Sequence, residues 1–151
     1  MKIKLINVGD TDLSFLREGI DYYLKKITHY VPTEIIDLPG IKAGKTTGTE
    51  QLKKSEGNMI LKYISPADIP ILLDEKGKQF TSVGFSVYLQ QWMNKGVKNL
   101  TFITGGAFGF SKEVYNRVNE QISLSAMTFP HQLVRLIFLE QLYRALTILK
   151  G

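Results

Sequence analysis

The stretch NLTFITGGAFGFSKE, residues 99–113, joins a short apolar run to two adjacent glycines and then to a possible helix start. The run at 99–105 is typical of a buried strand. In open α/β sheets, ligands bind beyond the carboxyl ends of the strands, which is where Gly105 and Gly106 fall. Because glycine leaves the backbone open, this turn predicts either a close approach by a ligand or a tight structural turn.

Three further apolar runs predict strands, at 3–9, 33–39 and 69–75. Each is short and is closed by Gly, Pro or Asp. Their nearly continuous apolar character is typical of strands buried on both faces, as in a parallel sheet.

Apolar residues at helical spacing connect these strands. They are Leu13, Leu16, Ile20, Leu24 and Ile27, then Leu52, Met59, Ile60 and Tyr63, then Val83, Val87, Tyr88, Trp92 and Met93. Gly96 is predicted to end the third helix. Ser111 is predicted to cap a fourth over 112–121, with Glu113 in its favourable first turn. The alternation predicts one α/β domain over 1–151, with a mostly parallel sheet and helices on both faces.

The composition supports a globular protein, because hydrophobic residues make up 44% of the 151 residues and charged residues 22%. A net charge of +5 weakly favours a polyanionic partner. Cysteine is absent and the two histidines, His29 and His131, form no ligand cluster, so no metal is expected. No apolar run reaches the roughly 18 residues of a membrane span, and a cytoplasmic protein is expected.

One polar, glycine-containing stretch, at 39–51, carries Lys42 and Lys45. It predicts either a solvated loop or a mobile lid that contacts phosphate. The segment GIKAGKTTG (40–48) has three residues between its first two glycines where a P-loop has four, so a P-loop is excluded. GGAFGF likewise does not fit the dinucleotide pattern G-x-G-x-x-G, which argues against a dehydrogenase.

The segment 122–130 contains no charged side chain, and Pro130 ends it. It is compatible with backbone groups that hold an adenine edge, and equally with a fifth buried strand. His131 and Arg135 follow, four residues apart on one helical face. A histidine can act as an acid or base near neutral pH and an arginine can bind phosphate, although a capping or packing role would use the same residues.

The predicted last helix, at about 132–149, is apolar almost all round. A helix with apolar residues on every side is expected to be buried. In a chain of this length a second subunit is expected to cover part of this helix, so the sequence predicts a two-fold homodimer.

Five blocks together carry a family resemblance. They are INVG (6–9), LLDEKGK (72–78), ITGGAFGF (103–110), LSAMTFPHQLVR (124–135) and EQLYRA (140–145). In this order and spacing they closely resemble the ribosomal RNA large-subunit methyltransferase H family, a minimal branch of the SPOUT class. The resemblance implies a C-terminal trefoil knot and a homodimer. It also implies S-adenosyl-L-methionine as cofactor and methylation of N3 of a pseudouridine in large-subunit ribosomal RNA of the assembled ribosome.

The resemblance also implies residue roles. The expected cofactor-binding residues are Leu73, Gly105, Gly106, Leu124, Ser125, Ala126, Met127, Thr128 and Phe129. His131 and Arg135 are the catalytic candidates, and Arg144, Lys42 and Lys45 are expected to contact RNA. The family pattern continues with a Tyr-His tail, roughly G-x-x-Y-H-K, that this sequence lacks, so cofactor binding with weak methyl transfer is one expectation. Two alternatives are a non-enzymatic RNA- or ribosome-binding module and a SPOUT enzyme acting on another RNA.

Overall fold

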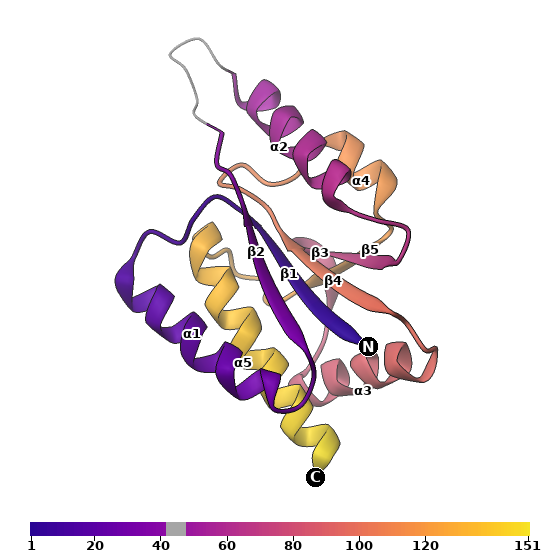
Figure 1. Ribbon diagram of the computed structural model, residues 1–151. Helices are drawn as coiled ribbons and strands as arrows, with labels where there is room; N and C mark the ends of the chain where they lie inside the picture. Colours follow the sequence, from indigo (N-terminus) through magenta and orange to yellow (C-terminus); the bar gives the residue numbers. More distant parts are fainter. Residues whose placement is uncertain (42–47) are drawn as a thin grey trace.

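The structure, a computed structural model, describes residues 1–41 and 48–151, in which strands and helices alternate (Figure 1). The elements are β1 (Lys2–Val8), α1 (Ser14–Thr28), β2 (Thr33–Leu38), α2 (Thr49–Tyr63), β3 (Asp68–Gln79), α3 (Ser82–Asn94), β4 (Asn99–Thr104), α4 (Lys112–Arg117), β5 (Glu120–Ser123) and α5 (His131–Lys150).

The strands form one five-stranded sheet in the order β2-β1-β4-β3-β5, and the neighbouring strands pair in parallel. All parallel pairs place their carboxyl ends at one edge, so the loops that follow β3, β4 and β5 meet there. The four strands expected from the sequence are confirmed, and so is the parallel α/β architecture.

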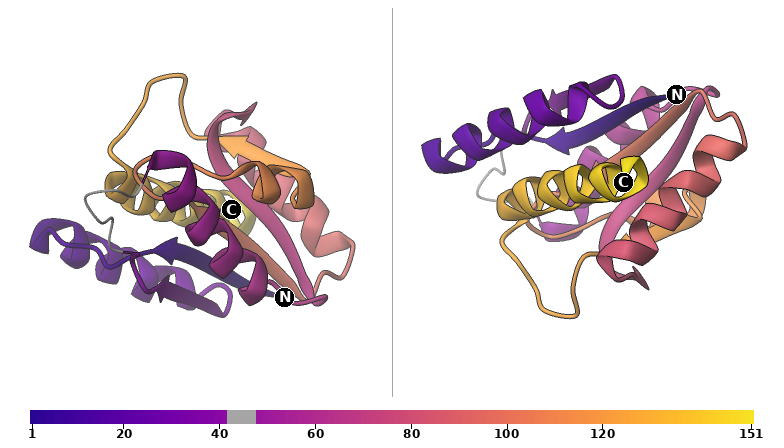
Figure 2. Two further views of the ribbon diagram at one scale, coloured as in Figure 1. Left: turned by 90° about the horizontal axis from the view of Figure 1, so that it is seen from above. Right: turned by 90° about the horizontal axis from the view of Figure 1, so that it is seen from below.

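The two faces of the sheet bury alternate residues of the same strands, as a doubly covered sheet requires. Leu5 and Phe102 belong to the core on the face covered by α1, α3 and α5. Ile6 and Ile103, the next residues along, belong to the core under α2 and α4. Figure 2 shows α1, α5 and α3 side by side on one face and α2 and α4 on the other, which confirms helices on both faces.

The fourth helix is shorter than the sequence predicted. Ser111 does cap it, since its Oγ accepts a hydrogen bond from the backbone N of Val114 at 3.3 Å. However, the helix ends at Arg117, because Val118 is already extended (φ −111°, ψ 112°) and the chain turns into β5 at Glu120. The prediction of a helix to 121 was therefore wrong. The fifth-strand interpretation of 122–130 holds only for its first two residues.

Two features of α3, its end and its buried face, can be compared with the sequence prediction. Gly96, which follows α3, has the positive φ of +71° expected of a helix terminator. Val83 and Val87 are exposed, while Phe85 and Leu89 are buried against the sheet. The predicted stripe thus combined these two valines with Tyr88, Trp92 and Met93, which pack against the core, and it left out Phe85 and Leu89.

Helix α5 lies between α1 and α3 and packs on both of them. Its central residues Phe138, Leu139 and Leu142 are fully buried against the sheet. Helices α1 and α3 and the sheet therefore cover much of α5, whose sequence is apolar almost all round. This cover comes from the same chain, and the homodimer stays a prediction.

The pairing of strand β3 with the edge strand β5 is interrupted. Both Leu73 and Lys78 pair with Ile122 of β5, so residues 74–77 leave the ladder between them. Gly77 permits this excursion, because a Cβ there would lie 2.6 Å from the backbone N of Ile122. The excursion leaves residues 74–76 unpaired with β5.

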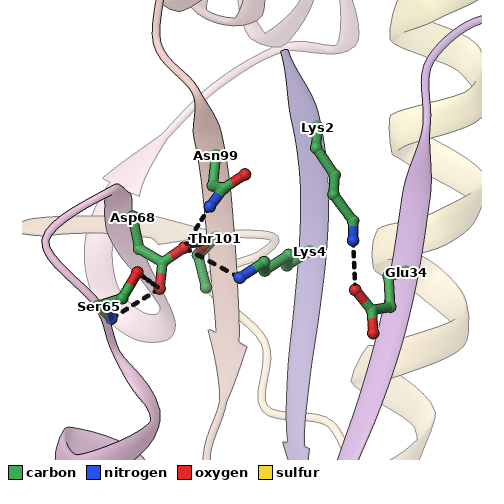
Figure 3. Close-up of polar contacts among 7 residues, drawn as sticks. All are labelled: Lys2, Lys4, Glu34, Ser65, Asp68, Asn99 and Thr101. Atoms are coloured by element: carbon green, nitrogen blue, oxygen red, sulfur yellow. Dashed lines mark hydrogen bonds and ion pairs between the residues drawn. The ribbon is translucent and has the colours of Figure 1, made fainter.

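A buried polar cluster closes the opposite, amino end of the sheet (Figure 3). The side chain of Asp68 is fully buried and forms an ion pair with Lys4, whose Nζ lies 3.2 Å from Oδ1. The same carboxylate accepts hydrogen bonds from the Ser65 backbone N at 2.8 Å, from Asn99 Nδ2 at 3.0 Å and from Thr101 Oγ1 at 3.2 Å. Burial opposes ionisation, but the hydrogen bonds from Ser65, Lys4 and Asn99 and the charge of Lys4 hold the pKa of Asp68 below its ordinary value.

Candidate functional site

Residues 73–76 of β3 and the loops after β4 and β5 enclose a cavity of about 560 Å³ at the carboxyl edge of the sheet. This is the position at which α/β proteins commonly bind ligands. The lining residues are Lys53, Leu73, Asp74, Glu75, Lys76, Thr104, Gly105, Gly106, Ala107, Phe108, Gly109, Phe110, Tyr115, Ser123, Leu124, Ser125, Met127, Thr128, Phe129, Pro130, His131 and Val134.

The turn after β4 is a tight loop that requires its glycines. The backbone N of Gly109 donates to the carbonyl of Gly106 at 3.1 Å, and Gly109 has a φ of +84°. A Cβ on Gly105 would lie 3.3 Å from the backbone of Gly109. The structural interpretation of this turn is therefore confirmed, and the same turn lines the cavity.

Glu56 of α2 lies beneath the turn. A Cβ on Gly106 would come within 2.7 Å of the Glu56 carboxylate, so the missing side chain makes room for this group. Glu56 is 8% exposed, and its Oε1 has no hydrogen-bond partner among the described residues. Burial raises the pKa of this carboxyl group. Nothing in the sequence pattern pointed to Glu56.

The loop after β5 is ordered by two serines. Ser123 Oγ donates to the carbonyl of Ser125 at 2.8 Å, and Ser125 Oγ accepts from the backbone N of Met127 at 3.0 Å. Of the expected cofactor residues at 124–129, all except Ala126 line the cavity. Leu73, Gly105 and Gly106 line it as well.

Asp74 and Tyr115 form a polar pair in the cavity wall that sequence reasoning missed. The Tyr115 hydroxyl donates to Oδ2 of Asp74, whose Oδ1 accepts from the backbone N of Lys76 at 2.9 Å. Burial, and then the hydrogen bond and charge of Asp74, raise the pKa of Tyr115, so its phenol stays a neutral donor. The end of a predicted strand could have pointed to Asp74, whereas Tyr115 sits on a short helix with no such indication.

His131 begins α5 and lines the cavity. Burial and then the charge of Arg135 lower its pKa from 6.5, although Asp12 opposes the shift. The imidazole is therefore neutral at pH 7 and can accept a proton.

Arg135 lies in the interior and does not line the cavity. Its Nη1 donates to Thr11 Oγ1 at 2.9 Å and its Nη2 to the carbonyl of Val8 at 2.8 Å. Burial lowers its pKa, against the charges of Asp37, Asp12 and Asp10. In this arrangement the guanidinium is not available to a substrate phosphate, and any effect on catalysis passes through the turn after β1.

The expected RNA contacts lie elsewhere. Arg144 is exposed on α5, outside the cavity, and pairs with Glu140 one helical turn earlier. Lys42 and Lys45 lie outside the described residues. Within the described part of the chain, no group of three or more His, Cys, Asp or Glu side chains could hold a metal ion. The helices of that same part include none that is both long and apolar enough to cross a membrane.

A parallel α/β sheet with a cavity beyond the carboxyl ends of its strands occurs in many ligand-binding α/β proteins, and comparison with known families identifies the class to which this chain belongs. The sequence model of the family described as "Predicted SPOUT methyltransferase" matches residues 1–151. The chain belongs to the SPOUT methyltransferase family.

Several relatives carry one and the same name, ribosomal RNA large subunit methyltransferase H. The chain is 51% identical to the relative from Parabacteroides distasonis, over 100% of this chain and 96% of that protein. It is 49% identical to the one from Christiangramia forsetii, with the same coverage. It is 48% identical to the one from Cytophaga hutchinsonii, over 100% of this chain and 97% of that protein. The resemblance stated from the sequence motifs is confirmed.

Proposed function

We propose that the protein transfers a methyl group from S-adenosyl-L-methionine to N3 of a pseudouridine in large-subunit ribosomal RNA, within the assembled ribosome. The observation that carries this proposal is the identity of 48–51% over the whole chain with proteins named ribosomal RNA large subunit methyltransferase H. The donor, the atom and the assembled substrate follow from the motif resemblance.

The cofactor would be held by Leu73, Gly105, Gly106 and residues 124–129. The fit rests on the cavity, whose volume of about 560 Å³ is in the range of small-molecule sites. Leucine, phenylalanine and glycine backbone form much of its wall, while Asp74 and Glu75 offer carboxylates to a cationic ligand. When bound, S-adenosyl-L-methionine supplies a methyl group activated by its positively charged sulfur.

His131 is the proposed proton acceptor, because the target nitrogen must lose a proton and this neutral imidazole lines the cavity. Methyl transfer should rise with pH through a value below 6.5 and then stay level. His131→Ala should lower kcat by about 10²–10⁴-fold with cofactor affinity nearly kept. An unchanged kcat would remove His131 from the mechanism.

Arg135 is proposed as a positioning residue. It ties α5 to the turn after β1 through Val8 and Thr11. Arg135→Ala should lower turnover with cofactor affinity nearly kept, and Arg135→Lys, which cannot make both bonds, should not restore it. Unchanged turnover in Arg135→Ala would reject this role.

Arg144, Lys42 and Lys45 are proposed to contact RNA phosphates. Exposure of Arg144 on α5 supports its inclusion. Arg144→Ala should raise KM for the ribosome. It should also reduce the slope of the logarithm of the binding constant against the logarithm of salt concentration by about 1. A salt dependence equal to that of the wild type would exclude it.

A trefoil knot and a two-fold homodimer are part of the proposal. Support for the knot is that α5 follows β5 at the edge of the sheet, yet lies between α1 and α3. Support for the dimer is that Leu13 and Phe15 of the α1 region are exposed beside α5. A crystal structure would test the chain path, and sedimentation equilibrium would test the dimer, with a monomer at micromolar concentration as the contrary result.

The decisive assay uses radiolabelled S-adenosyl-L-methionine and ribosomes that lack the modification, with free ribosomal RNA and transfer RNA as controls. Label in one pseudouridine of the large subunit is expected. Calorimetry with the donor separates the alternatives. A protein that binds ribosomes but no donor is a non-enzymatic module, and label in transfer RNA alone identifies another substrate.

A further inference from the structure

Two apolar side chains stand at the mouth of the cavity. Phe108, from the loop after β4, is 54% exposed, and Met127, from the loop after β5, is 75% exposed. Both nevertheless line the cavity. Exposed apolar groups on the rim of a cavity that also carries charged side chains commonly mark a binding surface.

The backbone, rather than packing, holds Phe108 in this place. The hydrogen bond between Gly106 and Gly109 closes this loop, and the carboxylate of Glu56 lies against Gly106. Among the described residues, the ring of Phe108 forms no aromatic or cation–π pair, whereas Phe110, two residues later, is buried and pairs with Tyr115. The fold therefore leaves one face of the Phe108 ring available.

The chemistry around Phe108 indicates what would cover it. Lys53 and Lys76 line the same cavity, and the chain carries a net charge of +5. An unpaired aromatic face beside cations is the arrangement that binds a nucleobase together with its phosphate. A purely apolar partner would instead meet the carboxylates of Asp74 and Glu75 and the two lysines, which line the same cavity.

We propose that Phe108 is the platform on which the base to be methylated stacks when it enters the cavity mouth. The inference rests on the proposed function and names how the same site holds its RNA substrate. Stacking on Phe108 would place the plane of the base across the mouth, so that its edge can face the cavity. Phe108 thus determines how productively RNA binds and leaves the binding of the methyl donor unaffected.

The test compares Phe108→Ala with Phe108→Tyr, which keeps the ring. Tyr63→Ala is the matched control, because Tyr63 is 41% exposed at the end of α2 and does not line the cavity. Steady-state kinetics on unmodified ribosomes, calorimetry with S-adenosyl-L-methionine and thermal melting are measured for all three. Because the Phe108 side chain is largely exposed, the fold should tolerate its loss.

Phe108→Ala should lower kcat/KM for ribosomes by about 5- to 150-fold, the fold-change that corresponds to the usual contribution of one stacked base. Phe108→Tyr and Tyr63→Ala should stay near the wild type, and donor affinity should be equal in all. An unchanged kcat/KM in Phe108→Ala, or an equal loss of donor affinity, overturns the inference while the wild type remains active. A wild type that methylates no ribosomal RNA overturns the proposed function, and this inference with it.

Discussion

Replacing Asp68 with asparagine removes one charge from the buried cluster at the amino end of the sheet and changes its shape very little. Asparagine presents one oxygen where the carboxylate presents two. If that oxygen keeps the bonds from Lys4, Asn99 and Thr101, the two donors of Ser65 face an amide NH₂ group. Each hydrogen bond to a charged group contributes about 1.5–3 kcal/mol, and breaking a buried ion pair costs about 3–5 kcal/mol. Asp68→Asn should therefore lower the free energy of unfolding by about 3–5 kcal/mol.

Glu34→Gln is the matched control, since it removes one carboxylate from an exposed ion pair on neighbouring strands (Figure 3). Lys2 and Glu34 form an ion pair whose side chains are 42% and 46% exposed. Such a surface pair contributes about 0–1 kcal/mol. Urea denaturation of both variants at pH 7 gives the comparison directly. A loss in Asp68→Asn no larger than in Glu34→Gln would refute the argument from burial.

The pH dependence gives a second, independent test. The pKa of Asp68 is lower in the folded protein than its ordinary 3.8, so its stabilising contribution is complete above 3.8. It is lost as the pH falls through the lower, folded value, because only then is the carboxylate protonated in both states. The gap between wild type and Asp68→Asn should be constant from about pH 5 to 8 and close only in stronger acid. A stability difference between the two proteins that widens in acid would contradict a lowered pKa of Asp68.

Three further outcomes are expected. Gly77→Ala should lower stability by about 1–3 kcal/mol in urea denaturation, because its Cβ would lie 2.6 Å from the backbone of Ile122. Glu56→Gln should be about 1 kcal/mol more stable than the wild type at pH 7. Because the folded pKa of Glu56 is raised above 4.5, this advantage should shrink as the pH falls below the folded value, and a gap independent of pH would contradict it. Tyr115→Phe should lower the melting temperature slightly by removing the donor to Asp74, and an unchanged value would show that solvent replaces that bond.

The sheet and its outer helices could be predicted from the sequence because their residues obey simple periodicities. Apolar runs of strand length gave β1 to β4, and helical spacing gave α1 to α3. The end of α4 could not be predicted, since β5 is too short to show a period. Its pairing with β3 is a long-range contact that local propensity does not encode.

The candidate site, too, could be predicted from the sequence only in part. The glycine turn and the segment 124–129 were found through residue types and family motifs, and most of their residues line one cavity. Arg135 and Glu56 show the limit of that approach. The sequence gives no measure of enclosure, so an arginine expected at a substrate lies in the core, and a buried glutamate under Gly106 was not recognised.

The interruption of β3 has a consequence for how this protein could be altered. Pairing with β5 stops at Leu73 and resumes at Lys78, both opposite Ile122, so the intervening chain contributes nothing to the alignment of the two strands. Residues 75 and 76 can therefore be exchanged as a cassette while Asp74 keeps its bond with Tyr115 and Gly77 restores the alignment behind them. Libraries confined to these two positions would reshape the cavity wall without disturbing the frame that supports it.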